Sequence, residues 1–494
     1  MALPTGLYSA AQVRALDAYA IDQLGVPGYT LMKRAGEAAL RYLRSRWPTA
    51  YRVIIVCGSG NNGGDGYVLA RFAQAAGLTV TALSATPPSA LKGDALLAYN
   101  DCVSSGARIL PFTPELLKDG ELIVDALLGT GLKSAIRESL VPVVQAINLS
   151  GKQVFALDVP SGLDSDTGVA HGDVVHADCT VSFVGLKTGL VIGDGPEYAG
   201  TLYFDDLEVT PPAQDTQFSP RLERILETEI VQALPRRRRA AHKGDFGKVL
   251  IVGSGPSMPG ATRLAGEACL RVGAGLVTVA VAPENLAAIA SGRPELICLP
   301  FREAGELSEA IERAQVIAVG PGLGRSSWAR EALDAVLASG KPLVVDADAL
   351  NLVAEATGKT QLRNCILTPH PGEAARLLGV DTDEVQRDRL TALGSLVERY
   401  GATVVLKGAG TLVGGPSRTP AVCERGNPGM ASAGMGDVLT GTIAGILAQC
   451  RDPWLAARVG VLAHAMAGDA VARTGERGLL ASDVARELRT CVNL

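Results

Sequence analysis

The chain has 494 residues, of which 46 are basic and 51 acidic, giving a formal net charge of −5. At this length we expect two to four domains, and the near balance of charge disfavours a nucleic-acid-binding protein, which is usually strongly basic. The nine cysteines form no C-x-x-C pair and show no zinc spacing with the five histidines. No apolar run reaches transmembrane length and the first residues do not resemble a signal peptide, so we expect a reduced, cytoplasmic protein without nucleic-acid or membrane partners.

The N-terminal part begins with two segments of helical periodicity. Residues 9–24 and 30–46 carry apolar side chains at helical spacing, with Ser9 as a plausible N-cap. An apolar strand at 52–57 follows, and its composition suits burial on both faces of a sheet.

A glycine-rich loop connects this strand to the next helix. Gly58, Gly60 and Gly63 satisfy the G-x-G-x-x-G pattern of dinucleotide-binding folds. The second strand, 78–83, is followed by no carboxylate that could hold a ribose hydroxyl. The pattern therefore disfavours an ordinary NAD-dependent dehydrogenase but is compatible with a Rossmann-like fold.

Two later strands, 121–126 and 153–157, also end in polar loops that contain glycine. These loops, 125–133 and 158–164, should lie beside the first loop at the carboxyl edge of a parallel sheet, where ligands bind. Carboxylates after strands often only cap the next helix. Because three loops each carry carboxylates and glycines, we favour a ligand site.

Residues 210–215 are polar and contain two prolines, which makes them the best candidate for a linker. We expect one domain over 1–212 and another over 220–494. Residues 221–234 then predict a short amphipathic helix. The basic run 236–239 is interpreted as a solvated segment or a phosphate-facing edge.

The second half repeats a pattern of strand, glycine loop and helix. The expected strands are 248–253, 316–319, 342–345, 365–367 and 403–406. This alternation predicts a second parallel α/β sheet, without a Walker A sequence.

Residues 427–441 contain the most informative loop of this half. Three glycines, Gly429, Gly434 and Gly436, lead into a helix of small apolar residues, and the N–H groups of such a turn favour an anion, above all phosphate. Asp437 would stand beside that anion, which suits a base that accepts a proton from an attacking hydroxyl. The alternative interpretation is a simple helix N-cap.

Three motifs resemble a known family. Residues 433–437, AGMGD, are similar to the anion-hole and catalytic-base motif of ribokinase-like kinases, with Met435 where Ala is usual. Residues 368–373, TPHPGE, and 407–411, KGAGT, match a narrower group within that superfamily. Together with the N-terminal half, these motifs resemble the bifunctional NAD(P)H-hydrate repair enzymes, over nearly the whole chain. The resemblance implies an α/β protein with an N-terminal Rossmann-like and a C-terminal ribokinase-like three-layer αβα domain.

The resemblance implies an N-terminal domain that epimerises R- and S-NAD(P)H hydrate. Its site residues would lie on the loops at the carboxyl edge of the sheet. The hydrate would be held by Asn61, Asn62, Gly63, Gly64 and Asp65. The phosphate-contacting loop would be Gly129, Thr130, Gly131, Leu132, Lys133, Ser134 and Ala135. Asp158 would reach the reacting end as a catalytic residue, and a potassium ion would be held by Asn62, Asp125 and Ser161.

The C-terminal domain would dehydrate S-NAD(P)H hydrate to NAD(P)H with ADP or ATP and Mg²⁺, releasing AMP or ADP and phosphate. Asp437 would be its catalytic base. The resemblance implies that the hydrate also contacts Ala261, Gly322 and His370. The adenine nucleotide would be held by Lys407, Gly408, Ala409, Gly410, Thr411, Gly434, Met435 and Gly436.

Two other functions remain open at this point. One is a sugar or vitamin kinase fused to a dinucleotide-binding module, which would release a stable phosphorylated product. The other is a non-catalytic dinucleotide sensor, which would bind NADH without turnover. We also expect a homo-oligomer, whose size the sequence does not define.

Overall fold

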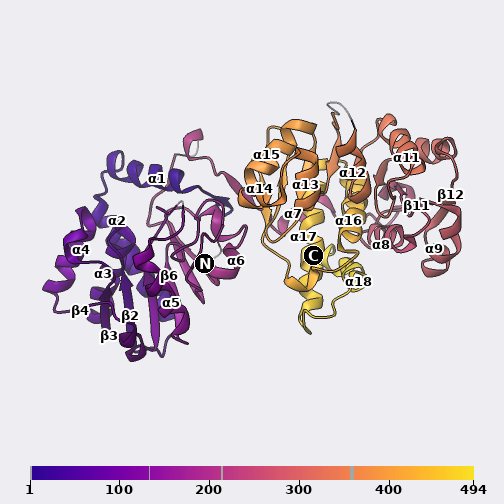
Figure 1. Ribbon diagram of the computed structural model, residues 1–494. Helices are drawn as coiled ribbons and strands as arrows, with labels where there is room; N and C mark the ends of the chain where they lie inside the picture. The colour runs from indigo at the N-terminus through magenta and orange to yellow at the C-terminus, as the bar shows by residue number, and fades with distance from the viewer. Residues whose placement is uncertain (1–2, 133, 213–214, 357–360) are drawn as a thin grey trace. The chain divides into compact units, whose positions relative to one another are not determined.

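A computed structural model describes residues 3–132, 134–212, 215–356 and 361–494. The chain divides into two compact units, Met1–Glu223 and Arg224–Leu494. Both are built of alternating strands and helices, as the sequence predicts (Figure 1).

The first unit is organised on a 7-stranded sheet in the order β4-β3-β2-β5-β6-β7-β8, with every neighbouring pair parallel. Its strands in chain order are β2 (Arg52–Cys57), β3 (Thr79–Ser84), β4 (Arg108–Pro111), β5 (Leu122–Ala126), β6 (Gln153–Leu157), β7 (Cys179–Phe183) and β8 (Thr201–Asp205). Its helices are α1 (Ala10–Asp22), α2 (Gly28–Arg46), α3 (Asn61–Ala75), α4 (Gly93–Ser104), α5 (Val141–Leu149) and α6 (Gly195–Ala199).

Alternate residues of β2 point into two separate cores, which makes the first unit a three-layer αβα domain. Val53 and Ile55 face a core built with α1 to α4, whereas Ile54 and Val56 face one built with α5. Ser9 caps α1 through a capping box with Gln12, as predicted for that residue. A short antiparallel pair, β1 (Gly6–Leu7) with β9 (Leu222–Arg224), joins the two ends of this unit.

The second unit contains the strand order β18-β17-β16-β15-β14-β13-β10-β11-β12. Strands β10 to β16 run parallel, and β17 and β18 add an antiparallel edge. The strands are β10 (Lys248–Val252), β11 (Leu276–Val281), β12 (Ile297–Pro300), β13 (Val316–Val319), β14 (Leu343–Val345), β15 (Cys365–Leu367), β16 (Thr403–Leu406), β17 (Thr411–Gly414) and β18 (Ala421–Cys423).

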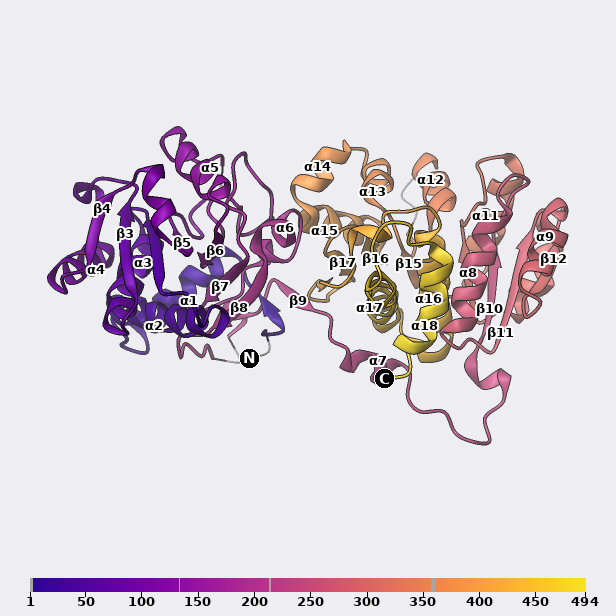
Figure 2. The same cartoon turned by 90° about the horizontal axis from the view of Figure 1, so that it is seen from below.

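Helices cover both faces of this sheet, which completes a second three-layer domain (Figures 1 and 2). On one side lie α7 (Thr228–Ala233), α8 (Pro259–Arg271), α16 (Met435–Cys450), α17 (Pro453–Ala472) and α18 (Ala481–Cys491). The remaining helices are α9 (Leu286–Gly292), α10 (Ser308–Arg313), α11 (Ser327–Ala338), α12 (Ala347–Glu355), α13 (Pro371–Leu378), α14 (Thr382–Arg387) and α15 (Arg389–Tyr400).

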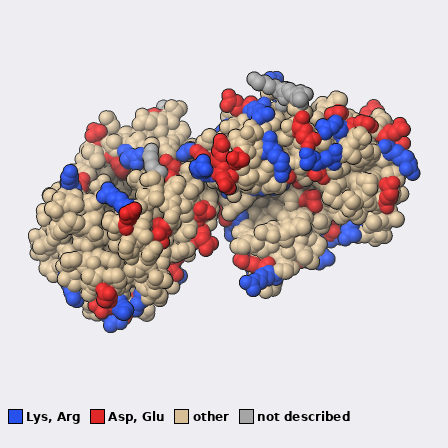
Figure 3. All heavy atoms as spheres, viewed as in Figure 1, with Lys and Arg blue, Asp and Glu red and all other residues tan. Residues whose placement is uncertain are grey.

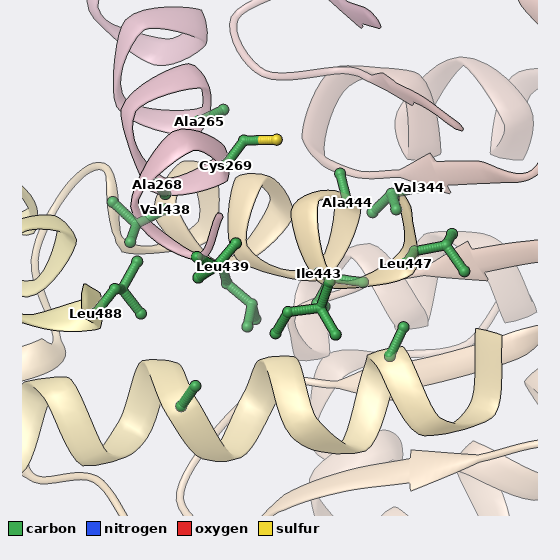
Figure 4. Packing of buried hydrophobic residues seen from close by; sticks show 14 of the residues in the cluster. Ala265, Ala268, Cys269, Val344, Val438, Leu439, Ile443, Ala444, Leu447 and Leu488 are labelled. Carbon is green, nitrogen blue, oxygen red and sulfur yellow. The ribbon is translucent and has the colours of Figure 1, made fainter. Parts of the chain in front are cut away.

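Helix α16 is the centre of the second unit's core. Its apolar side chains pack against α8, α18 and β14, where Val438, Leu439 and Ile443 are almost fully buried (Figure 4). Within the described residues α17 has the length and hydropathy of a membrane span, but 67% of that window is buried inside this unit. A core helix of a globular domain has these same properties.

The prediction of one helix over 221–234 is wrong. Residues 222–224 form β9, and the helix is confined to α7. The apolar spacing was compatible with both structures, because Leu222 is buried within β9 and Ile225 is buried directly after it, without a helix face.

Candidate active sites

In the first unit, the loops after β2, β5 and β6 meet at the carboxyl edge of the sheet. Glycines allow them to pack closely: a Cβ at Gly58 would overlap the carbonyl oxygen of Leu127, and one at Gly63 would overlap that of Gly58. The buried carboxylate of Asp125 bridges two loops. It accepts hydrogen bonds from the hydroxyl of Ser161 at 2.7 Å and from its N–H at 2.8 Å. Burial raises the pKa of Asp125 to about 6, although the hydrogen bonds from Ser161 oppose this rise.

Asn62, Asp125 and Ser161, the three residues expected to hold potassium, lie together around Leu128. The amide of Asn62 donates to the carbonyl of Leu128 at 2.9 Å, and the N–H of Leu128 donates to the hydroxyl of Ser161 at 2.9 Å. The Oδ1 atom of Asn62 is buried without a hydrogen-bond partner among the described residues. An unpartnered amide oxygen beside a hydroxyl and a carboxylate fits a hard cation such as potassium.

Asp158 follows β6 in the left-handed backbone region, with φ of 66°. For a residue other than glycine this conformation is strained and is often found at functional sites. Its carboxylate forms an ion pair with Lys187, whose side chain is only 1% exposed and whose ammonium also donates to the carbonyl of Phe183 at 2.8 Å.

Two more carboxyl groups surround this ion pair. Burial and the charge of Asp158 raise the pKa of Asp65 well above its ordinary value. The pKa of Asp17 on α1 rises to about 6, mainly because of burial, while Lys187 opposes the rise. The group therefore combines two carboxyls whose pKa is raised with a third that forms an ion pair with a buried ammonium.

The predicted phosphate loop begins beside these groups. A Cβ at Gly129 would stand 3.4 Å from the Asn62 side chain and 3.4 Å from the Asp158 carboxylate. The rest of the loop is half-buried or exposed, at Thr130, Gly131, Leu132, Ser134 and Ala135. Lys133 lies outside the described residues. Of the first loop, Asn61 is exposed at the start of α3, whereas Asn62, Gly63 and Gly64 are buried.

In the second unit, Asp437 lies in the first turn of α16. Gly434 is the N-cap and has a φ of 89°, so the alternative that Asp437 is itself the cap is wrong. Burial raises the pKa of Asp437 to about 7, and the nearby carboxylate of Asp346 adds to this rise. Gly436 lies beside two charged groups: a Cβ there would be 3.4 Å from the Lys407 ammonium and 3.6 Å from the Asp346 carboxylate.

A buried ion-pair network underlies the start of α16. Lys407 contacts Asp346 at 2.8 Å and Glu373 at 3.6 Å. The second oxygen of Asp346 accepts a hydrogen bond from the hydroxyl of Thr440 at 2.7 Å. Burial lowers the pKa of Lys407, but the carboxylates of Asp346 and Glu373 outweigh burial and raise it. A fixed cation therefore lies behind the turn that is predicted to receive phosphate.

Arg389 forms hydrogen bonds to the backbone of the predicted nucleotide loop, 407–411. This buried guanidinium donates hydrogen bonds to three backbone carbonyls of the loop and the strand before it, those of Leu406, Lys407 and Ala409. Gly408 has a φ of 139°, which a larger side chain would rarely adopt, and Gly410 has a φ of 60°. The hydroxyl of Thr411 donates to the carbonyl of Gly408 at 2.8 Å.

The residues expected to contact the hydrate lie on neighbouring loops. His370 is the N-cap of α13, and its Nδ1 accepts from the N–H of Gly372 at 3.1 Å. Burial lowers its pKa, and Glu373 opposes this. Ala261 in the first turn of α8 faces Gly322, where a Cβ would stand 2.9 Å from that of Ala261. The side chain of Met435 is buried.

Sequence reasoning missed several side chains that complete these sites. Asp346 follows a strand in the same way as Asp158, so a local signal existed. Asp17, Lys187, Arg389 and Thr440 have no such signal, because only the fold brings them to the sites. Both sites lack a cluster of three or more His, Cys, Asp or Glu suited to a metal ion, as does the rest of the described chain.

The fold and the two sites define a protein with an N-terminal Rossmann-like domain and a C-terminal ribokinase-like domain. Residues 28–189 match the family described as YjeF-related protein N-terminus, and residues 249–490 match NAD(P)H-hydrate dehydratase. A ribokinase-like superfamily protein of Enterococcus faecalis matches the structure with a TM-score of 0.52 and 29% identity, covering 57% of this chain and 98% of that one.

Relatives match the whole chain. The bifunctional NAD(P)H-hydrate repair enzyme of Coxiella burnetii is 47% identical over 491 residues, covering 99% of this chain and 100% of that protein. The Escherichia coli enzyme of the same name is 42% identical, with coverage of 100% and 95%. The ADP/ATP-dependent NAD(P)H-hydrate dehydratase of Bacillus subtilis, co-crystallised with ATP and Mg²⁺, matches with a TM-score of 0.50 and 28% identity, covering 55% of this chain and 97% of that one. The chain belongs to the family of bifunctional NAD(P)H-hydrate repair enzymes.

Proposed function

We propose that this chain restores hydrated NADH and NADPH at two sites, epimerising the hydrate in the first unit and dehydrating its S form in the second. The observation that carries the proposal is Asp437, a carboxyl with a pKa of about 7 at a glycine-lined helix start, beside the buried Lys407. A kinase or sensor function is disfavoured, because relatives that span the whole chain are named as repair enzymes.

In the second unit, the first step is transfer of a phosphoryl group to the C6 hydroxyl of the S hydrate. Asp437 accepts the hydroxyl proton as the new O–P bond forms and the nucleotide's terminal P–O bond breaks, leaving AMP from ADP or ADP from ATP. The N–H groups of residues 434–436 and the ammonium of Lys407 stabilise the charge on the transferred group.

The second step is elimination. The ring nitrogen's lone pair expels phosphate from C6, and loss of a proton from C5 restores the double bond. Phosphorylation is required because phosphate leaves far more readily than hydroxide. Asp346 is tied to Lys407 and Thr440, so magnesium would arrive with the nucleotide phosphates, whose charge it neutralises.

In the first unit, the two kinds of carboxyl suit opposite proton transfers. Asp65 has a raised pKa and can donate a proton to the departing C6 oxygen, whereas Asp158 forms an ion pair with Lys187. Departure of water and its return to the other face of C6 interconverts the epimers, with protons conserved. Asn62, Asp125 and Ser161 would hold a potassium ion, which supplies a fixed positive charge between the loops.

The decisive experiment combines NADH hydrate, ADP or ATP and Mg²⁺ with the purified chain. We expect NADH absorbance and inorganic phosphate to appear together. A stable phosphorylated product without phosphate release would instead show a kinase, and binding without turnover would show a sensor.

A homo-oligomer, a cytoplasmic location and the absence of nucleic-acid and membrane partners remain predictions.

A further inference from the structure

The second unit has a cavity of about 1080 Å³ at the end opposite to Asp437. It lies among the carboxyl ends of α8, α16 and α18 and the segment that connects α7 to β10, which Figure 2 shows beside the end of the chain. Apolar side chains such as Leu234, Leu270 and Val272 form part of its wall. Its size is that of a site for a nucleotide-sized ligand.

Arginines dominate the charge of this cavity, in a chain whose net charge is −5. The lining arginines are Arg236, Arg237, Arg238, Arg271, Arg293 and Arg489, against the carboxylates of Asp245, Glu267 and Glu295. Glu267 is already paired with both Arg271 and Arg293. In the described part of the chain, no carboxylate forms an ion pair with Arg236, Arg238 or Arg489. Elsewhere, on the face in Figure 3, opposite charges are interspersed.

Among the described residues, the groups that contact the Arg237 guanidinium are neutral. Its guanidinium lies 3.6 Å from the centre of the Phe246 ring and donates to the Gln449 side chain at 2.9 Å and to the carbonyl of Gly273. Gly273 has a φ of 102°, and a Cβ there would overlap the guanidinium. Partial burial lowers the pKa of Arg237. The site therefore contains an ordered cation whose charge an anion would neutralise.

Close backbone packing also fixes the walls around Arg237. A Cβ at Gly275 would overlap the carbonyl oxygen of Lys243, and one at Gly247 would stand 2.5 Å from the Cβ of Ala448. The segment that carries Phe246 is thus fixed against β11 and α16. A cavity formed in advance loses less conformational entropy when a ligand enters.

The cavity is distinct from the catalytic site. Asp437 and Gln449 are near opposite ends of α16, about 18 Å apart along the axis at about 1.5 Å per residue. On α8, likewise, Ala261 lies in the first turn beside the predicted hydrate site, whereas Arg271 lies at the other end and lines the cavity.

We propose that this cavity is a second anion site, which binds a polyphosphate group such as that of a nucleotide. Arg237 provides the ordered cation, Arg236, Arg238 and Arg489 provide charge at the rim, and the apolar wall accommodates a base. The proposal is independent of the chemistry assigned to Asp437.

The test is calorimetric titration of the full chain with inorganic tripolyphosphate, and separately with ATP. The cavity variant combines Arg236→Gln, Arg238→Gln and Arg489→Gln. The matched control combines Arg302→Gln, Arg387→Gln and Arg418→Gln, which removes the same charge from exposed positions outside the cavity. Thermal unfolding and dehydratase activity establish that both variants are folded.

We expect the cavity variant to lose one binding equivalent of tripolyphosphate, or about tenfold or more in its affinity, while the control binds as the wild type does. A parallel loss of one ATP equivalent identifies a nucleotide as the ligand, and a loss confined to tripolyphosphate identifies free polyphosphate. Equal binding by both variants overturns the proposal. So does a change of oligomeric state without a change in anion binding, which would make the cavity an interface between copies.

Discussion

At the scale of single residues, Asp437 carries the sharpest prediction. Asp437→Asn preserves size but removes the proton acceptor, so nucleotide-dependent recovery of NADH should fall by about 10²–10⁴-fold. Nucleotide affinity should stay equal or rise, because a negative charge beside the phosphates disappears. Epimerisation should be unchanged. Measuring all three on one preparation checks this: near-normal dehydration would remove Asp437 as the base, and loss of both activities would indicate misfolding.

The raised pKa of Asp437 predicts the pH dependence of dehydration. Its ionised form is the base, so kcat should rise as the pH increases through about 7 and level off above it. Asp348 is one of the carboxylates that raise this pKa. Asp348→Asn should therefore move the profile to lower pH, while keeping an acceptor for the N–H of Gly324. An unshifted profile in this variant would contradict the assignment.

The unpartnered oxygen of Asn62 predicts a cation requirement confined to one activity. Replacing potassium with a bulky organic cation at constant ionic strength should lower epimerisation and leave dehydration nearly intact, because the site lies in the first unit. Rates of both reactions in the two salts provide the measurement. An equal fall in both would indicate a general salt effect.

At the scale of elements, the contact between α8 and α16 depends on glycine. A Cβ at Gly441 would overlap the carbonyl oxygen of Ala265, and the apolar packing of this helix pair surrounds that point (Figure 4). Gly441→Ala should therefore destabilise the second unit by about 1–3 kcal/mol. Gly394→Ala is the matched control, since that helical glycine is exposed with nothing within 4 Å, and it should stabilise by about 0.5–1 kcal/mol.

Urea unfolding distinguishes these two substitutions. Trp328 and Trp454 report on the second unit in a Trp47→Phe background, which removes the tryptophan of the first unit. If Gly441→Ala unfolds at the same urea concentration as Gly394→Ala, α8 can move away at little cost and the close packing is not required.

Local sequence patterns predicted most elements but not the contacts between them. The glycine run before Asp437 marked the start of α16, because backbone N–H groups and a left-handed turn need small residues. The pairs Asp158–Lys187 and Asp346–Lys407 are 29 and 61 residues apart, and no period or motif links them. The helix expected at 221–234 failed for the same reason, since β9 exists only through its partner strands.

At the scale of the whole molecule, the two units should fold separately. The sequence places the boundary at a proline-containing stretch and predicts fragments 1–212 and 220–494. In the structure, the division into two compact units falls between Glu223 and Arg224. Residues after 212 contribute to the first unit: the Phe218 ring packs on Tyr19 with centroids 5.2 Å apart, and Leu222 pairs with Leu7.

The last prediction concerns these fragments. Fragments 1–223 and 224–494 should each be soluble, the first with epimerase and the second with dehydratase activity, because each contains its own set of parallel strands and its own core. Fragment 1–212 should be less stable by about 2–4 kcal/mol, since it loses the buried Phe218 and Leu222 side chains, each of which contributes about 1.5–3 kcal/mol when fully buried. Thermal unfolding of the two N-terminal fragments tests the boundary, and activity assays test the division of labour. Equal stability of 1–212 and 1–223 would show that residues 213–223 do not belong to the first core, and two folded but inactive fragments would show that each site needs both units.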